Sequence, residues 1–142
     1  MGYPKIKPAF FSLNKLERII RPLKDVLPVN LRTGVVYELS CMNCNATYVG
    51  QTSRQLKIRI SEHKNHIRRN TDTHSVITEH RLALNHEFDW ENVRILDNER
   101  FLAKRLISEM IYIKLQENGL NLQIDTETLH NVYISFLPKL PY

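Results

Sequence analysis

The chain has 142 residues, which suits one domain with a modest hydrophobic core. Its 42% hydrophobic and 25% charged content is ordinary for a globular protein, and no apolar run approaches the ~18 residues of a membrane span. The N-terminus also lacks a signal-peptide pattern. These features argue against membrane and secreted proteins, and the formal charge of +5 favours polyanionic partners without proving one.

Residues 1–33 combine four prolines with a short amphipathic stretch, so we expect a linker or N-terminal extension, with room for one helix near residues 13–23. The folded domain is predicted over residues 34–142, with its compact part ending near Gln123. The tail after that point is apolar enough to dock back on the core. The tail residues expected to do so are Val132, Tyr133, Ile134, Phe136 and Leu137.

Two segments rich in β-branched and aromatic residues, 34–39 and 46–49, flank a Cys41-x-x-Cys44 knuckle and predict a β-hairpin. If the turn is centred on Met42 and Asn43, Tyr37 lies directly opposite Tyr48. Both phenols then point to the same side, with Cβ atoms ~5 Å apart. On its own, such a pair is more often structural than catalytic.

A helix is predicted from an N-cap at Ser53 to about Arg69. Its apolar stripe contains His63, and Arg59 lies on the edge of that stripe, where neither side chain is placed for simple solvation. The helix is also strongly basic. A charge run usually marks a solvated face, but this one suits DNA phosphates. The stripe is Leu56, Ile60 and Ile67, and the candidate DNA-binding residues are Arg54, Lys57, Lys64, Arg68 and Arg69.

A later helix, near residues 98–113, has a predicted apolar stripe of Leu102, Leu106 and Ile113. Glu109 falls within that stripe. A carboxylate there is costly unless it is paired or binds a metal ion. The alternative to a metal is a salt bridge to Arg105 or Arg59.

The element order reads β-β-α-α-β-α. Within it, Gly34-Val35-Val36-Tyr37, Tyr48-Val49-Gly50, Arg59, Glu62-His63 and Glu109 together resemble the GIY-YIG nuclease superfamily over residues 34–123. The resemblance implies an α+β fold, with a small three-stranded antiparallel sheet and flanking helices.

A second pattern, Cys41-x2-Cys44 followed by His80-x5-His86, resembles the nuclease domain at the C-terminal end of Penelope-like retroelement polyproteins. That resemblance implies a zinc-finger-like insertion, for which two thiolates and two imidazoles provide a complete tetrahedral shell. A reduced dithiol with unrelated histidines, or a site using His74 instead of His80, remain alternatives.

The superfamily resemblance also implies a mechanism for DNA hydrolysis. Glu109 would hold one catalytic divalent cation, Mg²⁺ or Mn²⁺, and Arg59 would neutralise the scissile phosphate. Tyr37 would act as general base, which requires its pKa to fall from the usual ~10. Tyr48 would orient the water or the phosphate, and His63 would assist proton transfer.

The family usually adds an asparagine after its last catalytic helix. Asn121 is the candidate and Asn118 its competitor. The residues that follow Asn121 depart from the family pattern, which leaves the role of Asn121 open.

The implied function is nicking of target DNA in the nucleus to prime reverse transcription, by a domain fused to or partnered with a reverse transcriptase. The oligomeric state is not specified by the sequence. Two other readings compete with an enzyme: a catalytically inactive, zinc-stabilised DNA-binding module, and a zinc-stabilised interaction domain.

Overall fold

A computed structural model describes residues 27–69, 75–135 and 137. The helix expected near residues 13–23 lies outside these residues, as does His74. In chain order the structure contains η2 (Val29–Leu31), β1 (Val35–Ser40), β2 (Thr47–Thr52), α1 (Leu56–Arg68), α2 (Val76–Leu84), β3 (Arg94–Asn98), α3 (Leu102–Leu115), η3 (Gln123–Thr126) and α4 (Asn131–Ile134). None of the helices described is long and apolar enough to cross a membrane.

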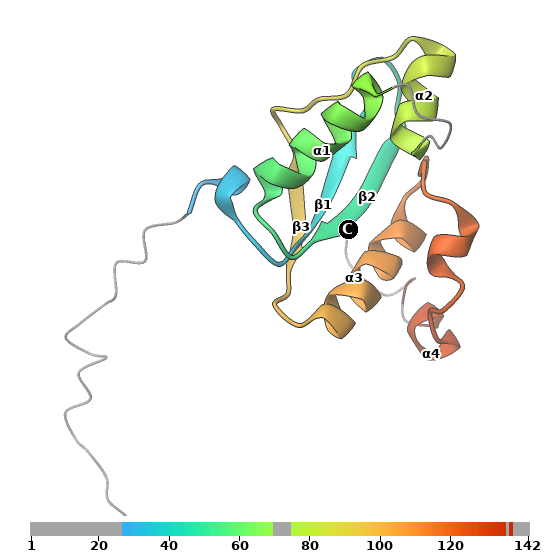
Figure 1. The fold of residues 1–142 in the computed structure, drawn as a ribbon. Helices are drawn as coiled ribbons and strands as arrows, with labels where there is room; N and C mark the ends of the chain where they lie inside the picture. The colour runs from blue at the N-terminus through green and yellow to red at the C-terminus, as the bar shows by residue number, and fades with distance from the viewer. Residues whose placement is uncertain (1–26, 70–74, 136, 138–142) are drawn as a thin grey trace, which may run out of the picture.

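The three strands form one antiparallel sheet in the order β2-β1-β3, which confirms the predicted fold class (Figure 1). The central strand β1 is bonded on both sides, and Val35, Val36, Tyr37 and Leu39 on it are fully buried. Such a strand favours β-branched and aromatic residues, because it packs on both faces of the sheet.

The hairpin register differs from the prediction. Tyr37 pairs with Gly50, and Tyr48 pairs with Leu39. The reason is the turn: the Cys41 amide donates to the Ala46 carbonyl at 2.9 Å, which centres the turn one residue later than assumed. A turn shifted by one residue moves each cross-strand partner by two, and a two-residue shift preserves the face of the sheet. The two phenols therefore remain on one side as diagonal neighbours, with ring centroids 6.4 Å apart.

Helix α1 begins at Leu56, so Ser53 is not its N-cap, and the Gln55 side chain that holds the cap position makes no capping hydrogen bond. Instead the Leu56 amide donates to the carbonyl of Arg32 at 3.0 Å. The segment before β1 thus provides a hydrogen-bond acceptor for an amide of the first helical turn, which has no partner within the helix. The predicted seam is correct: Leu56, Ile60 and His63 are buried, and Ile67 packs on the neighbouring core cluster.

Helix α3 presents a different face from the one predicted. Leu102 and Leu106 are 57% and 40% exposed, whereas Arg105 is 2% exposed. The Arg105 Nε donates to Gln51 Oε1 at 2.8 Å and Nη1 donates to the Glu99 carbonyl at 2.9 Å. A buried guanidinium is tolerated when its donors find such partners, and these partners turn the helix away from its leucine stripe.

The tail also docks differently from the prediction. Its start is anchored by Thr126 and Leu129, both buried. In α4, by contrast, Val132, Tyr133 and Ile134 are exposed rather than packed on the core. Of the other two expected residues, Leu137 is half-buried and Phe136 lies outside the described part of the chain.

Candidate active site and metal centre

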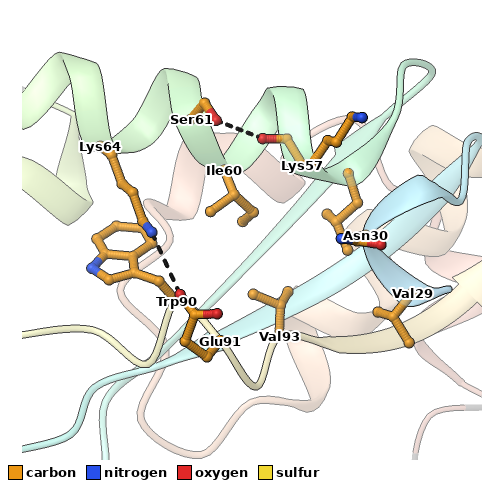
Figure 2. Close-up of a pocket in the computed structure, with 10 residues that line it drawn as sticks. Val29, Asn30, Lys57, Ile60, Ser61, Lys64, Trp90, Glu91 and Val93 are labelled. Atoms are coloured by element: carbon orange, nitrogen blue, oxygen red, sulfur yellow. Dashed lines mark hydrogen bonds and ion pairs between the residues drawn. The ribbon is translucent and has the colours of Figure 1, made fainter.

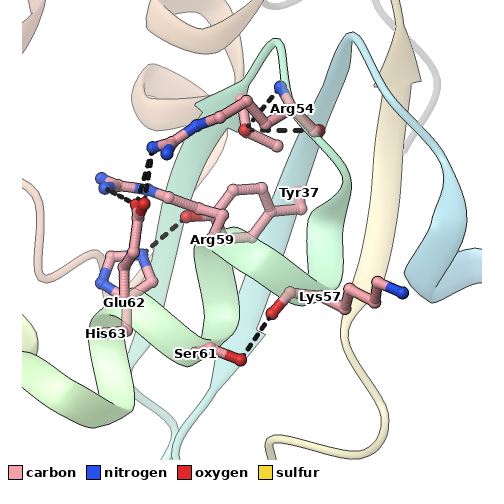
Figure 3. A network of polar contacts seen from close by, with 8 residues as sticks. Tyr37, Arg54, Lys57, Arg59, Ser61, Glu62 and His63 are labelled. Carbon is pink, nitrogen blue, oxygen red and sulfur yellow. Dashed lines mark hydrogen bonds and ion pairs between the residues drawn. The ribbon is translucent and has the colours of Figure 1, made fainter.

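Tyr37, Tyr48 and His63 form one aromatic cluster between the hairpin and α1. The Tyr37 hydroxyl and His63 Nε2 are 2.7 Å apart (Figure 3). The Tyr48 and His63 rings meet edge-on with centroids 5.5 Å apart. The side-chain alternation of the strands and the seam of α1 thus bring together three of the predicted catalytic residues.

Burial sets the protonation of this cluster. The pKa of His63 falls to about 3, because burial and then the charges of Arg59 and His66 disfavour the imidazolium. Burial, reinforced by Tyr48, raises the pKa of Tyr37 above its usual value. At neutral pH the phenol therefore donates its hydrogen bond to an uncharged imidazole. This shift is opposite to the one that a phenolate base requires.

Gly50 provides the space in which the two phenols meet. A Cβ at this position would lie 2.8 Å from the Tyr37 hydroxyl oxygen and 2.9 Å from Tyr48 Cε1. Gly50→Ala is therefore expected to displace the Tyr37 hydroxyl from His63 and to destabilise the fold by ~1–3 kcal/mol. The rate of plasmid nicking should fall even at temperatures where thermal unfolding shows that the variant is still folded.

Gly119→Ala is the control, because the three atoms nearest to its added Cβ all belong to the Gln116 side chain, at 2.6–3.2 Å, and none to the tyrosine cluster. Equal losses of activity in both glycine variants would contradict this role of Gly50.

Arg59 reaches the same cluster from the edge of α1. Its Nη1 lies 3.3 Å from Glu62 Oε2, and Arg54 pairs with the other oxygen of Glu62 at 2.7 Å (Figure 3). The Arg59 Nε is buried without a hydrogen-bond partner. Such an unsatisfied cationic donor is costly unless an anion completes its shell, and guanidinium geometry matches phosphate.

Glu109 on α3 is half-buried and makes no ion pair within 4.0 Å to any residue the structure describes. The alternative to a metal, a salt bridge to Arg105 or Arg59, is therefore absent there. Burial, and then the negative charge of Asp125, raise the pKa of Glu109 to about 7. A desolvated carboxylate without a cation is the donor that a divalent metal ion would stabilise.

Asp125 was not among the predicted site residues. Its charge also contributes to the raised pKa of Tyr48, although burial is the larger cause. No local pattern indicates this, because the tail returns to the site through η3.

Asn121 is a structural partner of β2. Its Oδ1 accepts from the Val49 amide and its Nδ2 donates to the Val49 carbonyl, both at 2.9 Å. Asn118 contributes only its backbone carbonyl, which accepts from Thr47 at 3.0 Å. The Asn121 side chain thus closes the outer edge of the strand that carries Tyr48.

We expect Asn121→Ala to cost ~1–3 kcal/mol in the free energy of unfolding, because the Val49 amide and carbonyl lose their partners. Asn118→Ala should be nearly neutral in the same urea titration. A destabilising Asn118→Ala beside a neutral Asn121→Ala would reverse the assignment.

Cys41, Cys44, His80 and His86 gather at the far end of the hairpin, with one ligand atom from each within 4.8 Å of the others. Cys41 Sγ to His86 Nδ1 and Cys44 Sγ to His80 Nε2 are each 3.6 Å, and the two imidazole nitrogens are 3.2 Å apart. Zinc in a tetrahedron, with bonds of ~2.3 Å to sulfur and ~2.0–2.1 Å to nitrogen, gives edges of about 3.6 and 3.3 Å. The predicted four residues therefore have the spacing of a tetrahedral metal site, and His80 occupies the position for which His74 was the alternative.

Backbone contacts hold the two halves of this cluster together. The Met42 amide donates to the Glu87 carbonyl at 2.8 Å, and the Asp89 amide donates to Ser40 at 2.9 Å. Asn85 ends α2 in the left-handed conformation with φ of 53°, directly before His86. The cluster therefore does not depend on a metal alone for its alignment.

The five predicted DNA-binding cations do not share one surface. Arg54 lies beside Arg59 on Glu62, whereas Lys57 points away from the tyrosine cluster (Figure 3). Lys64 contacts Trp90 and Glu91, and Arg68 and Arg69 are exposed at the end of α1.

The fold and these side chains define a small α+β domain in which a tyrosine–histidine pair, an arginine with an unsatisfied donor and a carboxylate without an ion pair among the described residues lie within electrostatic reach of one another. In agreement with this arrangement, residues 33–119 match the GIY-YIG catalytic domain family. The chain belongs to this family, whose members are nucleases acting on DNA. Searches of curated proteins and of solved structures gave no significant match.

Proposed function

We propose that this chain is a metal-dependent DNA endonuclease that hydrolyses phosphodiester bonds at the Tyr37–His63–Arg59–Glu109 centre. The observation that carries this proposal is Glu109, a half-buried carboxylate without an ion-pair partner among the described residues, close enough to Arg59 for that charge to act on its pKa, while the Arg59 Nε is itself buried without a hydrogen-bond partner. One needs a cation and the other an anion, and a metal ion with a DNA phosphate supplies both.

The residues fit a divalent cation at Glu109, with Mg²⁺ or Mn²⁺ as the proposed ion, because carboxylate oxygen is the ligand that such hard cations prefer. When bound, this ion would polarise the phosphate and favour ionisation of the attacking water. Arg59 would bind the scissile phosphate through its guanidinium, and Tyr48 would orient the water or the phosphate.

Tyr37 and His63 form a proton relay in this scheme. As water attacks phosphorus, the water proton passes to the Tyr37 oxygen while the Tyr37 proton passes to His63 Nε2. The bond to the sugar oxygen breaks, and this leaving oxygen takes its proton from solvent water. The relay explains how a phenol with a raised pKa can act as a base, since it gives up a proton as it gains one. A phosphate on Arg59 would also cancel part of the charge that now lowers the pKa of His63.

We infer that the Cys41, Cys44, His80 and His86 cluster holds structural zinc, because four protein ligands leave no open coordination position. The same spacing of cysteines and histidines supports a Penelope-like retroelement origin. The corresponding task would be target-DNA nicking in the nucleus for target-primed reverse transcription, with a reverse transcriptase fused to the domain or bound to it.

Arg59→Ala tests the assignment. With Mg²⁺ and supercoiled plasmid, the single-turnover nicking rate should fall by at least ~10²–10³-fold. Arg59→Lys should restore little of this rate, because a lysine ammonium cannot bind a phosphate through two parallel hydrogen bonds as a guanidinium does. Arg94→Ala is the control, since Arg94 lies on β3, across the sheet from β2. Nicking that survives Arg59→Ala would refute the proposed centre. DNA binding without nicking by the parent protein would support the inactive DNA-binding module.

A further inference from the structure

Helix α1 divides its polar residues between two flanks. Arg59, Glu62 and His66, at i, i+3 and i+7, follow the catalytic flank. Lys57, Ser61, Lys64 and Arg68, at i, i+4, i+7 and i+11, follow the opposite flank, and Figure 3 shows Lys57 and Ser61 pointing away from Tyr37 and Arg59. A helix with its side chains is ~10–12 Å across, so one phosphate cannot contact both flanks. A phosphate held by Arg59 therefore leaves the cations of the second flank without a ligand.

The second flank faces a groove. This groove, of about 340 Å³, lies between α1, η2 and the segment before β3 (Figure 2). Its apolar lining comes from Leu56, Ile60, Trp90 and Val93, with Lys57 and Lys64 at its rim. A second groove of about 290 Å³ continues past Trp90 and is lined by Lys64, Arg68 and Arg81, among others. Trp90 therefore stands between two hollows on a basic flank.

The Trp90 indole is half-buried, packs against both core clusters and is held in place. Its Nε1 donates to Glu87 Oε1 at 2.9 Å, and its ring packs against Phe88 with centroids 5.6 Å apart. Glu87 is itself fixed by Arg81 at 2.7 Å. Lys64 Nζ lies 5.6 Å from the indole centroid, as a flexible cation that can move aside. A fixed aromatic ring beside grooves that carry lysine and arginine is the make-up of a stacking platform for a nucleic-acid base.

Charge supports the same ligand. The two grooves contain four cations, Lys57, Lys64, Arg68 and Arg81, against the carboxylates of Glu87 and Glu91. Lys64 meets Glu91 only at 3.8 Å, and Lys57 has no carboxylate within 4.0 Å among the described residues. The flank is thus net positive beside an apolar floor, which suits a strand that offers both phosphates and unpaired bases.

We propose that this flank is a second nucleic-acid site, which binds a single-stranded segment by stacking a base on Trp90 and holding adjacent phosphates with Lys57 and Arg68. The site goes beyond the proposed nuclease centre and requires no metal. Paired bases in a duplex are closed to such stacking, so the site discriminates unpaired from paired strands.

Trp90 is the only tryptophan of the chain and so reports on its own site. The zinc-loaded protein, without added Mg²⁺, should show saturable quenching of tryptophan emission by a thymidine oligonucleotide. A duplex of equal length should quench much less, and a uridine oligonucleotide tests whether RNA is an equal ligand. Omitting Mg²⁺ separates this result from nicking, so failure of either proposal leaves the other standing.

The variants use anisotropy of a labelled oligonucleotide. Trp90→Leu should weaken binding about tenfold or more, and Trp90→Phe should lose less, because stacking is worth ~1–3 kcal/mol per base. Lys57→Ala with Arg68→Ala should reduce the salt slope by about 1.4, as expected for two phosphate contacts on a single strand. Lys104→Ala with Lys114→Ala, a pair of exposed α3 cations, is the charge-matched control.

Three outcomes would overturn the proposal. The first is equal quenching by duplex and single strand. The second is binding that falls equally in the control pair. The third is Trp90 emission that depends on protein concentration and ignores oligonucleotides, which would assign the groove to a second copy of this chain. Circular dichroism of each variant confirms that a loss of binding is not a loss of fold.

Discussion

Glu109→Gln is expected to abolish Mg²⁺-dependent nicking, with a loss of ~10³-fold or more, while the domain stays folded. Glutamine keeps the shape of the side chain but removes the charge that would hold the cation, and the electrostatic stabilisation of the transition state goes with it. Single-turnover nicking of supercoiled plasmid measures the loss. Glu117→Gln, an exposed carboxylate just beyond α3, should nick at the parental rate.

The same substitution should stabilise the metal-free protein. The pKa of Glu109 is raised to about 7 by burial and by Asp125. The native state therefore holds a proton that the unfolded chain releases near its ordinary pKa of ~4.3. The contribution of the Glu109 carboxyl to folding stability is fully present below pH ~4.3 and is lost as the pH rises to about 7. Above that pH the charged carboxylate costs about 2 kcal/mol, reduced from the full shift because the group is partly exposed.

Urea unfolding without Mg²⁺ measures this effect. The stability advantage of Glu109→Gln should be larger at pH 8 than at pH 5, and Mg²⁺ should remove it by stabilising only the parent. An advantage that does not change with pH would show that Glu109 is not desolvated. A parent that gains no stability from Mg²⁺ would show that Glu109 holds no cation.

Loss of the cysteine–histidine cluster should have the largest effect on the fold. Cys44→Ser is expected to release bound zinc and to melt α2 and the hairpin tip, because Zn²⁺ binding supplies ~10–16 kcal/mol even in small finger peptides. The central sheet has its own core of Val35, Tyr37, Leu56 and Ile60, so the loss should be partial. Zinc content by elemental analysis and amide exchange of residues 76–84 would measure it.

Met42→Ser is the matched control, because Met42 lies in the same turn with its side chain 67% exposed. It should retain one zinc per chain and parental exchange rates. Absence of zinc from the parent protein, or unchanged protection of α2 in Cys44→Ser, would refute a structural metal site.

The parts of the fold that follow from local periodicity could be predicted. Alternation in β1 placed Tyr37 on the inner face, and the spacing in α1 placed His63 in the core seam. The face of α3 could not be read in this way. Arg105 is buried because its guanidinium donates to the Gln51 side chain on β2 and to the Glu99 carbonyl before α3. Neither partner belongs to the sequence of α3 itself.

The candidate site, like the fold, could be predicted from the sequence only in part. The cluster of Cys41, Cys44, His80 and His86 could be predicted, because their pattern resembles that of a known zinc-finger-like insertion. The raised pKa of Tyr37 could not be foreseen, because it depends on how deeply the strand is buried. By contrast, the division of the basic residues between two flanks of α1 was available from helical periodicity alone, and it separates Lys57 and Arg68 from the catalytic side.

The most direct test of the account is whether the zinc-loaded parent protein nicks supercoiled plasmid in response to added Mg²⁺. We predict a saturable rise in the single-turnover rate and, in ¹⁸O-labelled water, one labelled oxygen at the newly formed phosphate end, because water is the nucleophile. Nicking that is unaffected by omitting divalent cations, or a covalent DNA–tyrosine adduct without label in the product, would contradict it.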